Sequence, residues 1–255
     1  MTAAMIELKG VSSGYGKKTV LSDVTANFAR GSLTSVIGLN GCGKSTLLKT
    51  VLGIMPFSYG EILLDGQNLN SMTRVEIAKK CAYLSQGKDT PDMTVEQLVL
   101  HGRFPHLSYP RRYRKRDMEI ARAAMAAVGI SELAEKSLCT LSGGMRQNAY
   151  IAMALAQDTD YILLDEPTTY LDIPHQLDLM RLLKRLSDEG KGIVTVMHDL
   201  PLAFDFSDRI CVIDKGTVRA QASPNDLSRD SVIQELFKVQ VKTAYSGKYY
   251  CNTQC

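Results

Sequence analysis

Apolar residues are spaced in two ways along the 255-residue chain, and the spacing predicts where strands and helices lie. Near the N-terminus they alternate with polar residues at Ile6, Leu8, Val20 and Val24, on both sides of the turn-forming GYGKK. This alternation predicts a small antiparallel sheet. Further on, the apolar runs LTSVI, CAYLSQ, YILLD and KGIVTV, typical of strands, are interleaved with helical runs such as NAYIAMALAQ and IPHQLDLMRLLKRLSDEG. This interleaving predicts an α/β fold.

A helical segment interrupts this pattern between about residues 87 and 145. It contains TVEQLVLHGR, MEIARAAMAAVGI and SELAEK, in which apolar residues recur at helical spacing, and it predicts an inserted helical subdomain. Within it, five of the six residues from Arg111 to Arg116 are basic. We expect this run to be a solvated loop, and contact with acidic lipid or an acidic partner is the alternative.

The C-terminal part of the chain carries weaker signals. RICVIDKGTVRAQAS is typical of a β-hairpin, and NDLSRDSVIQELFKV predicts short helices. The tail, residues 241–255, is polar and β-prone, and no function is predicted for it.

The composition fits a globular protein with a sizeable core, since 45% of the residues are hydrophobic. No apolar run approaches the roughly 18 residues that a membrane-spanning helix needs. The N-terminus MTAAMIELKG has neither the basic flank nor the apolar centre of a signal peptide, so we expect a cytoplasmic protein. A net charge of +3 is too small to predict a nucleic-acid partner.

The strongest chemical signal is GLNGCGKST, which follows the strand-like LTSVI and opens the helical KSTLLKTVLG. Gly38, Gly43, Lys44 and Ser45 satisfy the pattern G-x-x-x-x-G-K-[ST]. Glycines let successive backbone N–H groups converge on one anion, Lys44 adds a positive charge, and Ser45 offers a hard oxygen to Mg²⁺. We expect this phosphate cradle to bind nucleotide through Gly38, Asn40, Gly41, Cys42, Gly43, Lys44, Ser45 and Thr46.

Six cysteines are present, and none has the paired C-x-x-C spacing of a zinc site. Reduced thiols are therefore expected. Cys42 lies inside the cradle, where Lys44 and a helix N-terminus predict a lowered pKa. The terminal pair Cys251 and Cys255 could bind a metal or oxidise, or could be incidental residues of a frayed tail.

Polar side chains at the ends of three further strands suggest catalytic chemistry. YILLDE ends in Asp165 and Glu166, which point to opposite sides and can divide two roles, Asp165 holding Mg²⁺ and Glu166 acting on an attacking water. Gln86 ends CAYLSQ and can offer its amide oxygen to a metal or water. His198 ends KGIVTVMH and can donate to a phosphate oxygen. Taken alone, Gln86 could be a loop residue and His198 a structural group.

A second candidate anion site is LSGGMRQ, which opens the helix NAYIAMALAQ. Ser142, Gly143 and Gly144 would place a hydroxyl and two N–H groups at a helix N-terminus. An ordinary capped helix start is the alternative.

Taken together, these motifs resemble the ATP-binding-cassette family over about residues 3 to 240. The cradle resembles its Walker A loop, Gln86 its Q-loop, LSGGMRQ its signature, YILLDEP its Walker B, Leu171 and Asp172 its D-loop, and His198 its H-loop. Tyr15 matches the aromatic residue that stacks on adenine in the family, and no guanine-reading N-K-x-D occurs. The resemblance therefore implies ATP, with Mg²⁺, as the ligand, and Asp172 as a further nucleotide-site residue.

The resemblance also implies an architecture. It is a P-loop NTPase (RecA-like) core with a small N-terminal antiparallel β subdomain and an inserted helical subdomain, in a nucleotide-binding domain of residues 1–240. Two such domains would pack head to tail, with each ATP between the cradle of one and the signature of the other.

Within the family, TVEQLVLHGRFPH and LDIPHQLDLMRLL look most like cassettes of bacterial importers for iron–siderophore, haem or cobalamin chelates. The chain would then sit peripherally on the cytoplasmic face of the membrane. It would bind integral-membrane permease subunits and serve, indirectly, an extracytoplasmic binding protein. Asn148 and Met153 depart from the arginines that such cassettes often carry after the signature.

Other functions compete with import. A soluble cassette in cofactor or iron–sulfur assembly would share these motifs, and a pull-down of a membrane or a soluble partner separates the two readings. A DNA-repair cassette would need a long coiled coil between the phosphate loops, and the segment between them has no sustained heptads. Translation-type cassettes carry two nucleotide-binding units per chain, whereas this sequence shows one set of the motifs. A small-molecule kinase would need a pocket for its acceptor substrate and would not need the LSGG motif.

Overall fold

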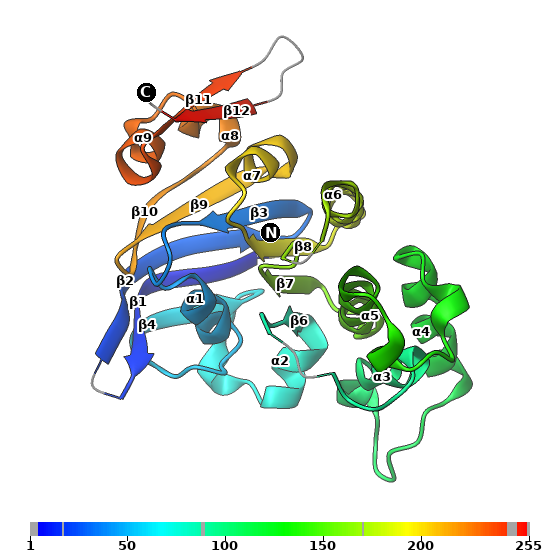
Figure 1. Ribbon diagram of the computed structural model, residues 1–255. Helices are drawn as coiled ribbons and strands as arrows, with labels where there is room; N and C mark the ends of the chain where they lie inside the picture. Colours follow the sequence, from blue (N-terminus) through cyan, green and yellow to red (C-terminus); the bar gives the residue numbers. More distant parts are fainter. Residues whose placement is uncertain (1–4, 17, 88–89, 170, 244–248, 254–255) are drawn as a thin grey trace.

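The computed structural model describes residues 5–16, 18–87, 90–169, 171–243 and 249–253, with no account of the side chains of residue 243 and residues 249–253. A six-stranded sheet forms its centre, in the order β10-β9-β3-β8-β7-β6 (Figure 1). Strands β9, β3, β8, β7 and β6 are parallel, and β10 is antiparallel to β9. The strands are β3 (Ser32–Ile37), β6 (Cys81–Leu84), β7 (Tyr161–Asp165), β8 (Gly192–Val196), β9 (Arg209–Asp214) and β10 (Thr217–Ala222).

A second sheet confirms the antiparallel sheet predicted at the N-terminus. Its order is β2-β1-β4-β5, made of β1 (Met5–Tyr15), β2 (Lys18–Ala29), β4 (Phe57–Leu64) and β5 (Gln67–Asn68). Ile6, Leu8 and Val24 are buried as expected, but Val20 is not: Leu21 takes the core position instead. The cause is a bulge at Asp23, whose φ of 51° shifts the register between the pairs Val11–Val24 and Ser13–Leu21.

The central sheet is covered on both faces because alternate side chains of its strands point in opposite directions. On one face Val36, Leu163 and Val194 join a core with the small sheet and helix α1 (Lys44–Val51). On the other face Ile37 and Leu164 join a larger core with most of the other helices. These include α3 (Val95–His101), α4 (Lys115–Ala127), α5 (Gly143–Ala156), α6 (Ile173–Asp188), α7 (Leu200–Phe206), α8 (Pro224–Leu227) and α9 (Ser231–Phe237).

The helical segment predicted between β6 and β7 is present as α3, α4 and the start of α5 (Figure 1). A buried ion pair joins Arg103 Nε to Asp117 Oδ1 at 3.0 Å, and Arg103 Nη1 donates to the Ala156 carbonyl at 2.9 Å. Next along the chain, Gln157 Nε2 donates to the carbonyl of Cys81, where β6 starts, at 3.0 Å. It also donates to the Ala78 carbonyl in α2 (Arg74–Lys80). The helical segment is thus fastened to the sheet at the end of α5.

The C-terminal hairpin pairs β11 (Val239–Thr243) with β12 (Tyr249–Thr253). The expected boundary between residues 240 and 241 falls within β11, whose Val239 and Val241 pack against the larger core. Cys255 and the side chain of Cys251 lie outside the described part of the chain. Among the helices that the structure describes, none has the length and apolarity required to cross a bilayer.

Candidate active site

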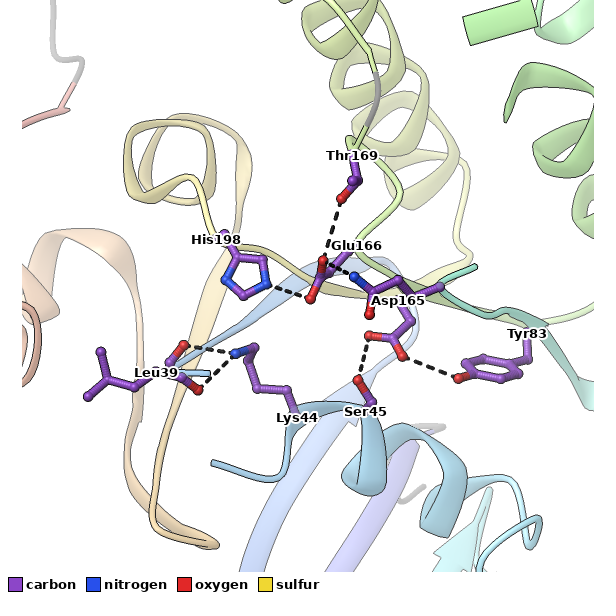
Figure 2. Close-up of polar contacts among 10 residues, drawn as sticks. Leu39, Lys44, Ser45, Tyr83, Asp165, Glu166, Thr169 and His198 are labelled. Carbon is purple, nitrogen blue, oxygen red and sulfur yellow. Dashed lines mark hydrogen bonds and ion pairs between the residues drawn. The ribbon is translucent and has the colours of Figure 1, made fainter. Parts of the chain in front are cut away.

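The phosphate cradle connects β3 to α1, and its glycines are required by its geometry. Gly41 and Gly43 have φ of 76° and 110°, a region that L side chains rarely adopt. At Gly38 a Cβ would lie 2.2 Å from the backbone oxygen of Ile213. Lys44 is buried, and its ammonium donates to the carbonyls of Gly38 at 2.9 Å and Leu39 at 3.1 Å (Figure 2). The charge is therefore held over the loop, as the motif predicts.

Cys42 corrects one prediction. Its thiol turns under the loop into the smaller core, where a Cβ on Gly38 would come within 2.6 Å of Cys42 Sγ. Burial raises the pKa of the Cys42 thiol, and the opposing effect of Lys44 is smaller. The prediction of a lowered pKa was wrong because the side chain faces apolar residues while only its backbone belongs to the cradle.

Ser45 and Asp165 meet where α1 starts and β7 ends. Ser45 Oγ donates to Asp165 Oδ1 at 2.9 Å, and the Tyr83 hydroxyl donates to Asp165 Oδ2 at 3.4 Å (Figure 2). Burial raises the pKa of Asp165 above its usual value. Tyr83 was not predicted from the sequence as a site residue. It could have been found only by predicting that CAYL and YILLD are neighbouring strands, because that pairing places Tyr83 beside Leu163.

This pair fits a magnesium ion. A hydroxyl and a carboxylate are hard oxygen donors, and Mg²⁺ takes few protein ligands because it keeps water and phosphate oxygens. Within the described residues, no group of three or more His, Cys, Asp and Glu side chains could hold a metal ion. A metal at Ser45 and Asp165 would therefore complete its coordination with water and phosphate oxygens.

Glu166 holds the centre of a polar cluster on the other side of β7. Gln86 Nε2 donates to Glu166 Oε2 at 2.5 Å, and His198 Nε2 lies 2.5 Å from Glu166 Oε1 (Figure 2). Thr169 Oγ1 is 3.5 Å from the same carboxylate. Glu166 has a φ of 52°, which is uncommon outside glycine and often marks functional residues. Gln86, Glu166 and His198 follow the ends of the three parallel strands β6, β7 and β8, as the sequence predicts.

One cavity of about 390 Å³ brings the cradle and this cluster together. Val20 was predicted from the sequence as one of the apolar residues of the small sheet and not as a site residue. The bulge in β2 turns Val20 toward the cavity instead of the core. The lining residues are Val20, Asn40, Gly41, Gly43, Lys44, Ser45, Thr46, Gln86, Glu166 and His198. A site that can hold phosphates thus faces a carboxylate that can accept a proton.

The other predicted residues lie outside this cavity. Ser142 caps α5 by accepting from the Met145 N–H at 3.3 Å, and it is exposed together with Gly143. Asp172 caps α6 and contacts His175, whose hydrogen bonds lower the pKa of the Asp172 carboxyl. Tyr15 ends β1 and is 51% exposed. Gly144 follows Gly143 in the first turn of α5.

Comparison with known proteins points in one direction. The family profile described as ABC transporter matches residues 21–169. The chain is 42% identical over 241 residues to the "Ferric enterobactin transport ATP-binding protein FepC" of Escherichia coli (strain K12), covering 93% of this chain and 89% of that protein. It is 41% identical over 231 residues to the "Iron(3+)-hydroxamate import ATP-binding protein FhuC" of Bacillus subtilis (strain 168), covering 90% and 86%.

Solved structures agree. The fold matches the "Dimeric Structure of MJ0796, a Bacterial ABC Transporter Cassette" with a TM-score of 0.75 at 29% identity, covering 86% of this chain and 98% of that one. A post-hydrolysis form of the same cassette, "bound to ADP and Pi", matches with a TM-score of 0.74 at 28% identity over 86% and 98%.

Proposed function

The chain belongs to the ABC transporter family, and on this premise we propose that it is the ATP-hydrolysing subunit of an importer for iron–siderophore, haem or cobalamin-type chelates. The observation that carries the proposal is the cavity lined both by the phosphate cradle and by Glu166. The substrate class is supported by the two relatives of 42% and 41% identity, which are named for ferric enterobactin transport and for iron(3+)-hydroxamate import.

The cradle supplies the binding energy for the phosphates. Backbone N–H groups around Gly41 and Gly43 and the start of α1 favour negative charge. We expect Lys44 to exchange its bonds to the Gly38 and Leu39 carbonyls for phosphate oxygens. Ser45 and Asp165 would hold Mg²⁺, which, when bound, neutralises charge that develops on the transferred phosphoryl group.

Glu166 is the expected general base. Its two carboxylate oxygens are oriented by separate partners, Gln86 on Oε2 and His198 on Oε1. An ionised Glu166 held in this way can accept the proton of an attacking water without first reorienting. Gln86 and His198 can also turn toward the metal or the phosphate, which are the roles that their positions in the family motifs imply.

A second chain would complete the site. Ser142, Gly143 and Gly144 do not line the cavity that contains the cradle, and Gly143 lines a neighbouring cavity with Gln86 and Glu166. All three residues are exposed or partly exposed, so a nucleotide held by another copy can reach them. A head-to-tail pair would place each ATP between one cradle and one signature loop, and Tyr15 and Asp172 would border it. The solved dimeric cassette with a similar fold supports this arrangement.

Import also needs a membrane partner. We place the chain on the cytoplasmic face of the membrane, bound to integral permease subunits that take their cargo from an extracytoplasmic binding protein. The relatives' names as transport and import ATP-binding proteins support this placement.

Uptake of a radioactive ferric siderophore tests the proposal. Cells that lack this chain should regain uptake with the wild-type chain but not with Lys44→Ala. Affinity purification from the same cells should recover an integral membrane partner. Full uptake without the chain, or recovery of only a soluble scaffold, would favour the alternative of an assembly ATPase.

A further inference from the structure

The connection between α3 and α4 extends away from the body of the molecule (Figure 1). Its last part and the first two residues of α4 form a basic segment, residues 108–116, which we call the basic loop. Residues 108–116 are all exposed, and they include five basic residues and no acidic one. The mechanism proposed above uses none of these residues.

The positive charge of this loop is largely uncompensated. The nearest acid in sequence, Asp117, is buried and is occupied by Arg103 and by the backbone N–H of Arg114. Lys115 has a weak partner in Glu119 at 3.9 Å. Arg111, Arg112 and Arg116 form no ion pair with any residue that the structure describes.

The position of these basic residues at the N-terminus of α4 is electrostatically unfavourable. Arg114 is the N-cap of α4, and Lys115 and Arg116 open its first turn, where the positive end of the helix dipole disfavours cations. Like charges on consecutive exposed residues add mutual repulsion. An unfavourable arrangement of this kind is expected where an external anion offsets it.

Aromatic side chains accompany the charge. Tyr109 is 97% exposed, and Phe104 and Tyr113 are 43% and 37% exposed. Phe104 lies 6.2 Å from Tyr113 between ring centroids, so these two rings cover each other in part and offer a poor platform for stacked bases. Exposed tyrosines beside cations are typical of the headgroup level of a membrane.

We propose that residues 108–116 dock onto anionic phospholipid headgroups, with Arg111, Arg112 and Arg116 supplying the attraction and Tyr109 entering the interface. This inference rests on the proposed function only for the chain's location beside a membrane. The contact would orient the helical segment relative to the bilayer independently of any permease.

Vesicle flotation with the full-length chain tests the contact. Wild-type chain should float with phosphatidylcholine vesicles that contain about one third phosphatidylglycerol, and not with pure phosphatidylcholine. Because the Debye length falls from about 10 Å at 0.1 M to 3 Å at 1 M salt, high salt should release it. The triple variant Arg111→Gln, Arg112→Gln, Arg116→Gln should bind on the order of 100-fold more weakly, since each near-surface cation contributes about fivefold.

A matched control removes the same charge elsewhere. Arg229, Lys238 and Lys242 are exposed and belong to the C-terminal part of the chain, at the opposite end of the view in Figure 1. Their triple change to Gln should leave flotation within about threefold of wild type. ATP hydrolysis by both triple variants, at the wild-type rate, confirms that each is folded.

A single tryptophan gives a second readout because the natural chain has none. In Tyr109→Trp, emission should shift to the blue with phosphatidylglycerol vesicles. In Tyr59→Trp, at another exposed position on β4, it should not shift.

Several outcomes would overturn the proposal: equal flotation of the two triple variants, equal flotation with uncharged vesicles, or loop-dependent retention of single-stranded RNA in place of vesicles. Failure of flotation with normal siderophore uptake would refute this contact and leave the proposed function standing. Loop-dependent flotation without any siderophore uptake would support this contact and refute the proposed function.

Discussion

The two glycine-containing loops that the sequence marks as anion sites differ in what surrounds them. In the cradle, a Cβ at Gly38 or Gly43 would collide with its own chain, at 2.2 Å from Ile213 O and 2.8 Å from Leu21 Cδ2. In the signature loop, a Cβ at Gly143 would meet nothing within 4 Å, and one at Gly144 would make an ordinary contact at 3.5 Å. The fold of one chain therefore explains the cradle glycines and leaves the signature glycines unexplained, which is expected if a second molecule approaches them.

The substitution Glu166→Gln should have the largest effect, because it should lower ATP hydrolysis without lowering nucleotide binding at the cradle. Glu166→Gln keeps the size of the side chain and removes the base, so ATP hydrolysis should fall on the order of 10²- to 10⁴-fold while MgATP still binds. Stopped assays of phosphate release and equilibrium dialysis of nucleotide measure the two properties. Wild-type turnover by this variant would show that Glu166 is not the base.

The next effect tests whether the signature loop works on another chain. Ser142→Arg should lower hydrolysis on the order of 10²-fold and spare nucleotide binding, whereas Lys44→Ala should lower both. A mixture of the two variants can form a head-to-tail dimer in which both lesions share one site and the other site is intact. Activity and light scattering with MgATP should then recover.

A mixture that stays as inactive and as monomeric as its components would mean that each signature loop serves its own chain. Mixing each variant with itself at the same total concentration is the control for protein amount.

A smaller effect compares the glycines directly. Gly38→Ala should lower the free energy of unfolding by about 1–3 kcal/mol, because the new methyl group has to displace backbone. Gly143→Ala should change it by about 0.5 kcal/mol or less while lowering hydrolysis. Urea unfolding of both variants measures the difference, and equal losses of stability would remove the contrast between the loops.

The smallest effect concerns two thiols. Cys139, three residues before Ser142, is exposed, and Cys42 is buried beneath the cradle with a raised pKa. Since the thiolate is the reactive form, iodoacetamide at neutral pH should label Cys139 at least about tenfold faster. Labelling of Cys42 should increase only as the pH rises toward its raised pKa. Peptide mass mapping separates the sites, and faster labelling of Cys42 would contradict its burial.

Much of the fold follows from local pattern, because apolar runs of strand length and capped helices are specified by neighbouring residues. The ends of β3, β6, β7 and β8 were predicted well enough to place Lys44, Gln86, Glu166 and His198, and the structure gathers these residues in one cavity.

The features that sequence reasoning missed depend on contacts between distant segments. Val20 and Leu21 exchange faces because Asp23 adopts a positive φ, which alternation cannot reveal. The pKa of Cys42 depends on which way its side chain turns, and that is set by packing against the underlying core. The hydrogen bond from Tyr83 to Asp165 requires knowing that β6 and β7 are neighbours.

The anchoring of the helical segment has a mechanical consequence. Arg103 donates a hydrogen bond to the carbonyl of Ala156, the last residue of α5. Gln157, the next residue, donates one to the carbonyl of Cys81, the first residue of β6. Strand β6 leads directly to Gln86, which touches Glu166. Because these contacts run without a break from the helical segment to Glu166, we expect a displacement of that segment to move Gln86 and, with it, to change the orientation of the Glu166 carboxylate.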